Sequence, residues 1–263
     1  MDETHSSPPR PLTDLVSAIG FLTLLPVGRA WPDDRPPRSV GWYPWVGWLL
    51  GGLALGVAYA AGLLATPGSN AATHAFVVAA VIMALWAFMT RFLHWDGLAD
   101  AFDGLWGGAT PERRLEIMRD SRIGSFGAAA MLMTAIVQVA CLTGLLADHR
   151  LWALLAAPVL GRFAAALSAW TMPSARREGL GLTAMERPGF YDVAVASLAL
   201  IALIGAVSIA DPMRGPAVVL IGLAAGVLVP RMLAQPVRGM TGDLFGATVL
   251  VVETLVLLVS AVV

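Results

Sequence analysis

The sequence has no lysine, a single cysteine and few charged residues of any kind. All 17 basic residues are arginine, and charged residues make up only 13% of the chain. Soluble domains carry about a quarter of their residues as charged side chains, so this composition argues against a water-soluble protein. The lone Cys141 excludes an internal disulfide and a cysteine-based metal cluster. The formal net charge of −1 provides no bulk field for nucleic acid, and no nucleic-acid partner is expected.

Long apolar stretches are what the sequence does have. Hydrophobic residues make up 57% of the chain, and the mean hydropathy is +0.74. A helix of about 20 apolar residues crosses the hydrocarbon core of a bilayer, and backbone polar groups must be paired there. The sequence therefore predicts an all-α, polytopic integral membrane protein that forms one domain over residues 1–263. About seven transmembrane helices are expected, at residues 41–66, 71–93, 124–147, 151–172, 189–210, 215–233 and 244–263.

The N-terminal region has a different pattern. Residues 1–11 are polar and rich in proline, which predicts a flexible tail. Residues 12–25, LTDLVSAIGFLTLL, are apolar but too short to span a membrane, and the apolar positions from Leu12 to Ile19 follow helical spacing. This pattern predicts an amphipathic helix at the membrane interface, with a re-entrant segment as the alternative.

The arginines predict the orientation. Loops that are rich in arginine alternate with loops that are poor in it, and the positive-inside rule places the rich ones in the cytoplasm. We therefore expect a multi-pass protein of the cytoplasmic (inner) membrane, with the N-terminus and the long polar loops on the cytoplasmic side. The arginine-rich segments are residues 1–40, 91–123, 173–188 and 231–243.

The stretch DGLADAFDG, residues 96–104, concentrates negative charge in this oily chain. Asp96, Asp100 and Asp103 are spaced i, i+4 and i+7, which places them within about 60° on one helix face. Like charges this close repel one another, and they are costly to desolvate at a membrane boundary. A solvated acidic helix end is the alternative, but the intervening residues are small or apolar. We predict that the three carboxylates bind Mg²⁺, with Mn²⁺ as a substitute.

The segment that follows adds glycines and a second charged helix. We expect Gly104, Gly107 and Gly108 to break the helix that carries the three aspartates and to let the backbone approach a ligand closely. Thr110 and Pro111 then predict the start of a helix over residues 111–122. Acids, glycines and arginines together predict a phosphate held by a metal. The candidates are Gly104, Gly107 and Gly108 for close approach, Glu116 and Asp120 for the metal, and Arg119 and Arg122 for anions.

Other polar residues lie near or inside the apolar stretches. Arg162 lies in mid-span, where a charge is expensive unless it faces a cavity or a partner, and Glu253 in the last span is a candidate partner. The loop SARREGLG, residues 174–181, either folds over a bound substrate or serves as a plain linker. His94 is either a polar neighbour of the site or an interfacial histidine. The further candidate substrate-binding residues are His94, Arg162, Arg177 and Asp243.

These motifs together resemble a known family. HWDGLADAFDGLWGG at 94–108, followed by RRLEIMRDSRIGSFG at 113–127, resembles the cobalamin 5'-phosphate synthases, also called adenosylcobinamide-GDP ribazoletransferases. The resemblance covers nearly the whole chain, and its departures, at Trp95, Ala101, Phe102 and Ser125, touch no acidic position. The weaker motifs, in the family's order, are FLTLLPVGR at 21–29, GR at 161–162, REGLG at 177–181 and TGDLFGATVLVVE at 241–253.

The resemblance implies an integral membrane enzyme of late cobamide assembly that uses Mg²⁺. It would transfer the adenosylcobinamide-phosphate group from adenosylcobinamide-GDP to α-ribazole or its 5'-phosphate and release GMP. Asp103 or Asp120 would act as general base, while Arg119, Arg122 and Arg162 would hold phosphates. The expected partners are these substrates and the lipid bilayer, and a homo-oligomer or an association with other corrinoid-assembly enzymes is left open.

Three other functions share part of this pattern. A CDP-alcohol phosphotransferase also spaces aspartates around a DG pair, but the Ala-Arg pair that should follow is missing, because Ala99 precedes Asp100. A prenyltransferase would need two acidic motifs in corresponding places. A cation-coupled transporter fits the topology and the charges inside the membrane, although such proteins often contain inverted repeats and carry acids at the midplane.

Overall fold

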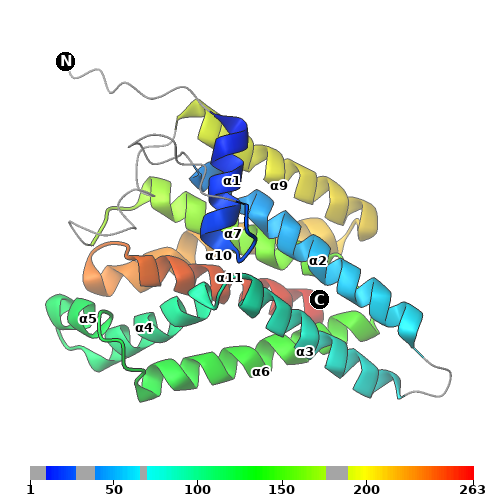
Figure 1. Ribbon diagram of the computed structural model, residues 1–263, viewed down its shortest axis with the longest axis horizontal. Coiled ribbons are helices and arrows are strands. Elements are labelled where there is room, and N and C mark those ends of the chain that lie inside the picture. Colours follow the sequence, from blue (N-terminus) through cyan, green and yellow to red (C-terminus); the bar gives the residue numbers. More distant parts are fainter. Residues whose placement is uncertain (1–9, 28–38, 66–69, 176–188) are drawn as a thin grey trace.

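The computed structural model describes residues 10–27, 39–65, 70–175 and 189–263, and every regular element within these ranges is a helix (Figure 1). Seven of the helices are long and apolar enough to cross a membrane, as expected of a multi-pass membrane protein. The predicted all-α fold is confirmed. The elements are α1 (Pro11–Leu22), η1 (Val40–Trp42), α2 (Tyr43–Leu64), α3 (Ala71–Met89), α4 (Leu93–Gly107), α5 (Pro111–Ile117), α6 (Ser125–Ala147), α7 (Ala153–Thr171), α9 (Phe190–Ala210), α10 (Arg214–Ala234), η2 (Gln235–Val237) and α11 (Gly242–Val262).

The predicted apolar stretch 71–93 contains a turn that periodicity did not reveal. Helix α3 ends at Met89, and Arg91 and Phe92 adopt positive φ angles of 53° and 57° before α4 begins. The Arg91 guanidinium donates hydrogen bonds to the carbonyl groups of Gly20, Phe21 and Thr23 at distances of 2.7–3.3 Å. These bonds satisfy carbonyl groups around the end of α1, which stops at Leu22 and is shorter than the predicted 12–25.

Helix α7 lies at the centre of the bundle and packs against α2, α9, α10 and α11. In α7, 78% of an 18-residue apolar stretch is buried inside the protein, compared with 56% in α11 and less in the other spanning helices. Glycines let neighbouring helices approach its backbone: a Cβ on Gly47 of α2 would lie 2.5 Å from the Pro158 carbonyl oxygen, and one on Gly51 would lie 2.8 Å from that of Leu154. Because lipid supplies little hydrophobic drive between helices, such close packing is a main source of association in a membrane.

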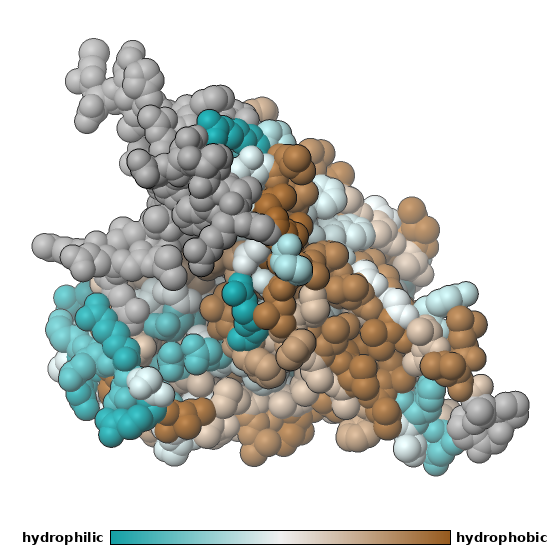
Figure 2. Space-filling model, viewed as in Figure 1, coloured by the Kyte–Doolittle hydropathy of each residue, from teal (hydrophilic) through white to brown (hydrophobic). Residues whose placement is uncertain are grey.

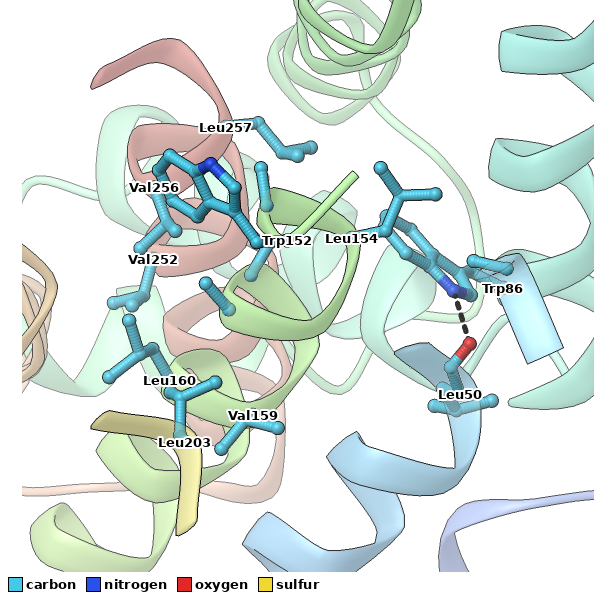
Figure 3. Close-up of a cluster of buried hydrophobic side chains, with 14 of the residues drawn as sticks. Leu50, Trp86, Trp152, Leu154, Val159, Leu160, Leu203, Val252, Val256 and Leu257 are labelled. Atoms are coloured by element: carbon cyan, nitrogen blue, oxygen red, sulfur yellow. Dashed lines mark hydrogen bonds between the residues drawn. The ribbon is translucent and has the colours of Figure 1, made fainter. Parts of the chain in front are cut away.

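The largest buried side chains fill the space around α7 (Figure 3). Trp86 of α3 is buried, and its indole N–H donates to the Leu50 carbonyl oxygen at 3.0 Å. On the other side of α2, Trp45 and Trp48 donate to the carbonyl oxygens of Val195 and Ala199 in α9 at 3.0 and 3.1 Å. These three tryptophans therefore fill volume while each indole N–H keeps a carbonyl partner.

Helices α4 and α5 lie together at one end of the bundle (Figure 1). In the view of Figure 2, hydrophilic residues cover this end, whereas hydrophobic residues cover much of the middle of the molecule. The short α4 packs against α11, α6 and α5 and is not one of the seven spanning helices. The long apolar helices therefore serve as a scaffold that holds a compact polar region at one end.

The close contact between α2 and α7 is tested by alanine at the glycines of α2. Gly47→Ala and Gly51→Ala should each destabilise the protein by about 1–3 kcal/mol, because the new methyl group meets backbone of α7. Gly52→Ala and Gly56→Ala are matched controls, since a Cβ at either position meets nothing within 4 Å. The measurement is thermal unfolding in detergent, and equal midpoints for the two pairs would contradict the account.

Candidate active site

The acidic face of α4 is the centre of the polar region. Asp96, Asp100 and Asp103 lie on this one helix, as their spacing predicted. Asp96 is in the first turn, where a negative charge is favourable at the helix N-terminus. Asp96 is exposed, Asp100 is half-buried and Asp103 is buried, so the three carboxylates have different access to a ligand.

The start of α11 lies directly beside this face. A Cβ on Gly97 would be 2.8 Å from the Asp243 carbonyl oxygen and 3.1 Å from Gly246 Cα, so the two helices cross with their backbones in contact. Thr241 caps α11 by accepting the Leu244 N–H at 3.2 Å, and Asp243 lies in the first turn. The predicted site residue Asp243 is thus brought next to α4 from a distant part of the sequence.

A short backbone pairing between residues 173–175 and Met240 lies next to the start of α11. The Ala175 N–H donates to the Met240 carbonyl oxygen at 2.9 Å, and the Met240 N–H donates to that of Pro173 at 2.8 Å. The pairing places Ser174 and Ala175, at the beginning of the SARREGLG loop, beside Met240, the residue that precedes Thr241. Arg177, the candidate in that loop, lies outside the described residues.

Asp103 has its own set of partners. One carboxylate oxygen accepts the Gly124 N–H at 2.7 Å and the other accepts the Gly127 N–H at 2.9 Å, both at the start of α6. Only 8% of Asp103 is exposed, compared with the open position of Asp96. This carboxylate therefore already holds two backbone donors at the start of α6.

The glycines after Asp103 pack against protein. Helix α4 continues through Gly104 and ends at Gly107, so the prediction that Gly104 breaks the helix is wrong. A Cβ on Gly104 would lie 2.8 Å from the Arg114 carbonyl oxygen, and one on Gly108 would lie 2.7 Å from the Arg114 amide nitrogen. Gly107 is less crowded, since a Cβ there would lie 3.4 Å from the Ile117 side chain. The lack of side chains lets α5 pack on α4.

Arg114 is a residue whose role sequence reasoning missed. The structure half-buries Arg114 between α5, the end of α4 and η2. Its Nε donates to the Gly108 carbonyl oxygen at 2.9 Å, and its Nη1 donates to that of Pro236 at 3.1 Å. Arg114 therefore ties α5 to the end of α4 and to η2, a long-range contact that no local signal in the sequence indicates.

The charged residues of the predicted second helix form surface pairs. Helix α5 ends at Ile117, short of the predicted residue 122. Glu116 pairs with Arg113 at 2.7 Å, and Asp120 pairs with Arg122 at 2.6 Å. Hydrogen bonds from Arg122 lower the pKa of Asp120 to about 2, so Asp120 is a weak base at neutral pH. Arg119 is exposed on the same turn and, unlike Arg113 and Arg122, forms no ion pair with a carboxylate of the described residues.

Arg162 is buried in the bundle, where the structure gives it the partner that its position required. Its guanidinium is 2% exposed, pairs with Glu253 of α11 and donates to the Pro158 carbonyl oxygen at 3.1 Å. His94 is also buried; its burial, followed by the charge of Arg162, lowers the pKa of His94 well below its ordinary value. The imidazole is therefore neutral, and Arg162 is committed to a carboxylate within the protein.

The donor chemistry of α4 fits a hard divalent ion. Across the described ranges, no three His, Cys, Asp or Glu side chains come together as a ready-made metal site. Mg²⁺, however, is usually bound by one or two carboxylates together with substrate phosphates and water. Asp96 and Asp100, one turn apart at the open end of the face, provide such a pair.

Variants of the buried ion pair can distinguish a structural role of Arg162 from a role in substrate binding. Arg162→Met should destabilise the protein by about 3–5 kcal/mol, because Glu253 is left charged and without its partner. The double variant Arg162→Met/Glu253→Leu should recover most of this loss. Thermal unfolding in detergent measures both. A stable double variant that has lost activity would instead assign Arg162 to substrate binding.

The sequence was also compared with known proteins. A model of the family described as cobalamin-5-phosphate synthase matches residues 14–261. The adenosylcobinamide-GDP ribazoletransferase of Roseiflexus sp. (strain RS-1) is 36% identical, over 97% of this chain and 93% of that protein. Proteins of the same name from Syntrophobacter fumaroxidans and Azorhizobium caulinodans are 37% and 38% identical, over 93% and 90% of this chain and 96% and 91% of theirs. No solved structure is significantly similar. The chain therefore belongs to the cobalamin-5-phosphate synthase family.

Proposed function

We propose that this chain catalyses the adenosylcobinamide-GDP ribazoletransferase reaction in cobalamin biosynthesis. The observation that carries this proposal is its similarity, over nearly its whole length, to curated proteins of that name. The acidic face of α4, beside the start of α11, supplies the local chemistry. The substrates would be adenosylcobinamide-GDP and α-ribazole or its 5'-phosphate.

The reaction is a phosphoryl transfer in which one bond forms and one breaks. A ribose hydroxyl oxygen of the ribazole bonds to the corrinoid-side phosphorus, and the bond from that phosphorus to the bridging oxygen of the diphosphate breaks. GMP leaves, and the hydroxyl proton is lost. Such transfers depend mostly on positioning and on stabilising negative charge, so the protein needs to supply little covalent chemistry.

Asp96 and Asp100 would hold Mg²⁺, or Mn²⁺, against the diphosphate. When bound, a divalent ion neutralises the diphosphate and makes GMP a better leaving group. Asp243, adjacent to α4, would complete the polar wall of the site. Arg119, exposed on the turn after α5, is the best-placed arginine for a phosphate, because Arg122 is paired with Asp120 and Arg162 with Glu253. The low pKa of Asp120 speaks against its use as a general base.

The predicted orientation places this end of the bundle in the cytoplasm, within the cytoplasmic (inner) membrane. The arginine-rich segments around α4 and α5 support that orientation through the positive-inside rule. The substrates would then reach the site from the cytoplasm, without crossing the bilayer.

Replacing Asp100 tests the metal role. Asp100→Asn should lower GMP release by about 10²-fold or more, the scale expected for losing a group that stabilises transition-state charge. Purified protein in detergent would receive adenosylcobinamide-GDP, α-ribazole and Mg²⁺. Asp148→Asn, at the end of α6 remote from α4 in sequence, is the control and should keep the wild-type rate and membrane insertion. Near-normal turnover by Asp100→Asn would rule out its metal role.

The orientation has a separate test because the only cysteine, Cys141, is buried. In a Cys141→Ser background, Ser121→Cys and Asp148→Cys place one exposed thiol after α5 and one at the end of α6. A membrane-impermeant maleimide should label Asp148→Cys in intact cells and Ser121→Cys only after permeabilisation. The reverse pattern would contradict the proposed orientation.

A further inference from the structure

The end of α4 and the start of α6 are joined by a single carboxylate. Gly124 is the N-cap residue of α6 and has no side chain with which to cap the helix. Asp103 supplies the cap, since it accepts the Gly124 and Gly127 N–H groups at 2.7 and 2.9 Å. These are the N-cap and N3 amides, the two that a capping box bonds from within its own helix. A residue of another helix thus performs both halves of a capping box.

The sequence at the start of α6 is shaped around this carboxylate. A Cβ on Gly124 would have Asp103 atoms as its three nearest neighbours, the closest well under 3.0 Å. A Cβ on Gly127 would overlap Asp103 and also lie 2.7 Å from the Ala99 carbonyl oxygen. The two glycines leave the space that Asp103 occupies, so the contact needs all three residues.

The contact closes a hairpin at its base. After Asp103 the chain continues to the end of α4, forms α5 and a charged turn, and returns at Gly124. The side of this hairpin is held separately, by the bonds of Arg114 to Gly108 and Pro236. The turn that carries Arg119 lies between these two attachments in the sequence.

We propose that Asp103 is a positioning residue, which locks the hairpin of residues 104–123 against the acidic face of α4, and that Asp96 and Asp100 handle the metal without it. This inference rests on the proposed function, because the hairpin matters for the phosphate of that reaction. Asp103 is buried and both its oxygens are engaged, whereas Asp96, two turns earlier, is open to a ligand.

Hydrogen exchange tests the lock without any substrate. Asp103→Asn keeps the shape but turns one acceptor into an NH₂ group that faces an N–H donor. Exchange of the amides at residues 124–127 should rise about tenfold or more, as expected when a hydrogen bond to a charged group is lost. Gly124→Ala should have the same effect with Asp103 intact, and Asp100→Asn should have none. Unchanged exchange in both Asp103→Asn and Gly124→Ala would overturn the proposal.

Kinetics then separate a positioning residue from a metal ligand, a base or a merely structural cap. For folded Asp103→Asn, GMP release should fall about tenfold while the Mg²⁺ concentration for half-maximal rate and the acidic limb of the pH–rate profile stay unchanged. Asp103→Ala, which loses both bonds, should be slower still. A tenfold rise in the Mg²⁺ requirement, loss of the acidic limb, or a wild-type rate in Asp103→Asn would overturn the proposal.

The proposed function and the positioning role fail in different ways. A wild-type protein that releases no GMP would overturn the proposed function, whereas the exchange of residues 124–127 would still decide whether Asp103 locks the hairpin. Normal GMP release by the wild type, with rapid exchange and an unaltered rate in Gly124→Ala and Asp103→Asn, would leave the function intact and overturn the positioning role.

Discussion

A hydrocarbon environment offers no water to a polar group, and the architecture of this protein follows from that constraint. Spanning helices satisfy their own backbone, but side chains with polar atoms need partners within the bundle. Trp86 finds one in the Leu50 carbonyl group, and Arg162 finds one in Glu253. The same constraint favours close helix contacts, which Gly47 and Gly51 make possible around α7. The bundle core is therefore held together by paired polar groups and close packing, and the candidate site lies at one end of the bundle.

The polar end is built from the short helices α4 and α5 and from the starts of the spanning helices α6 and α11. Helix α4 is short, carries the acids on one side and rests on the start of α11 through the contact between Gly97 and Gly246. Helix α5 is attached by Arg114, and the start of α6 by Asp103. The bundle of long helices supports α4, and the hairpin of residues 104–123 is attached to it. This arrangement is suited to phosphoryl transfer, because positioning of charged groups contributes most of the catalysis.

The sequence alone predicted features that follow from helical periodicity or from the high cost of a charge inside an apolar span. Helical spacing placed Asp96, Asp100 and Asp103 on one helix, and the cost of a charge in mid-span indicated that Arg162 needed a partner. Membership in the cobalamin-5-phosphate synthase family, expected from the α4 motif, is confirmed. The predicted metal, Mg²⁺, and the site residues remain predictions.

Features that depend on tertiary contact were not predictable in this way. A glycine beside a ligand and a glycine beside a neighbouring helix look alike in sequence, so the close packing of Gly104 and Gly108 against α5 was not predictable. Likewise, no local signal indicates that Asp103 accepts the N–H groups of Gly124 and Gly127, which lie more than 20 residues away in the sequence. The positive φ angles at Arg91 and Phe92 were hidden inside an apolar stretch.

The polar end of this bundle is proposed to transfer a phosphoryl-linked corrinoid to a ribazole. The decisive assay supplies the purified wild-type protein with adenosylcobinamide-GDP and α-ribazole and measures GMP and the joined corrinoid product together. Equal amounts of the two are expected, formed with Mg²⁺ and suppressed by a chelator. GMP without incorporation of ribazole, or no product with any divalent metal, would contradict the proposal.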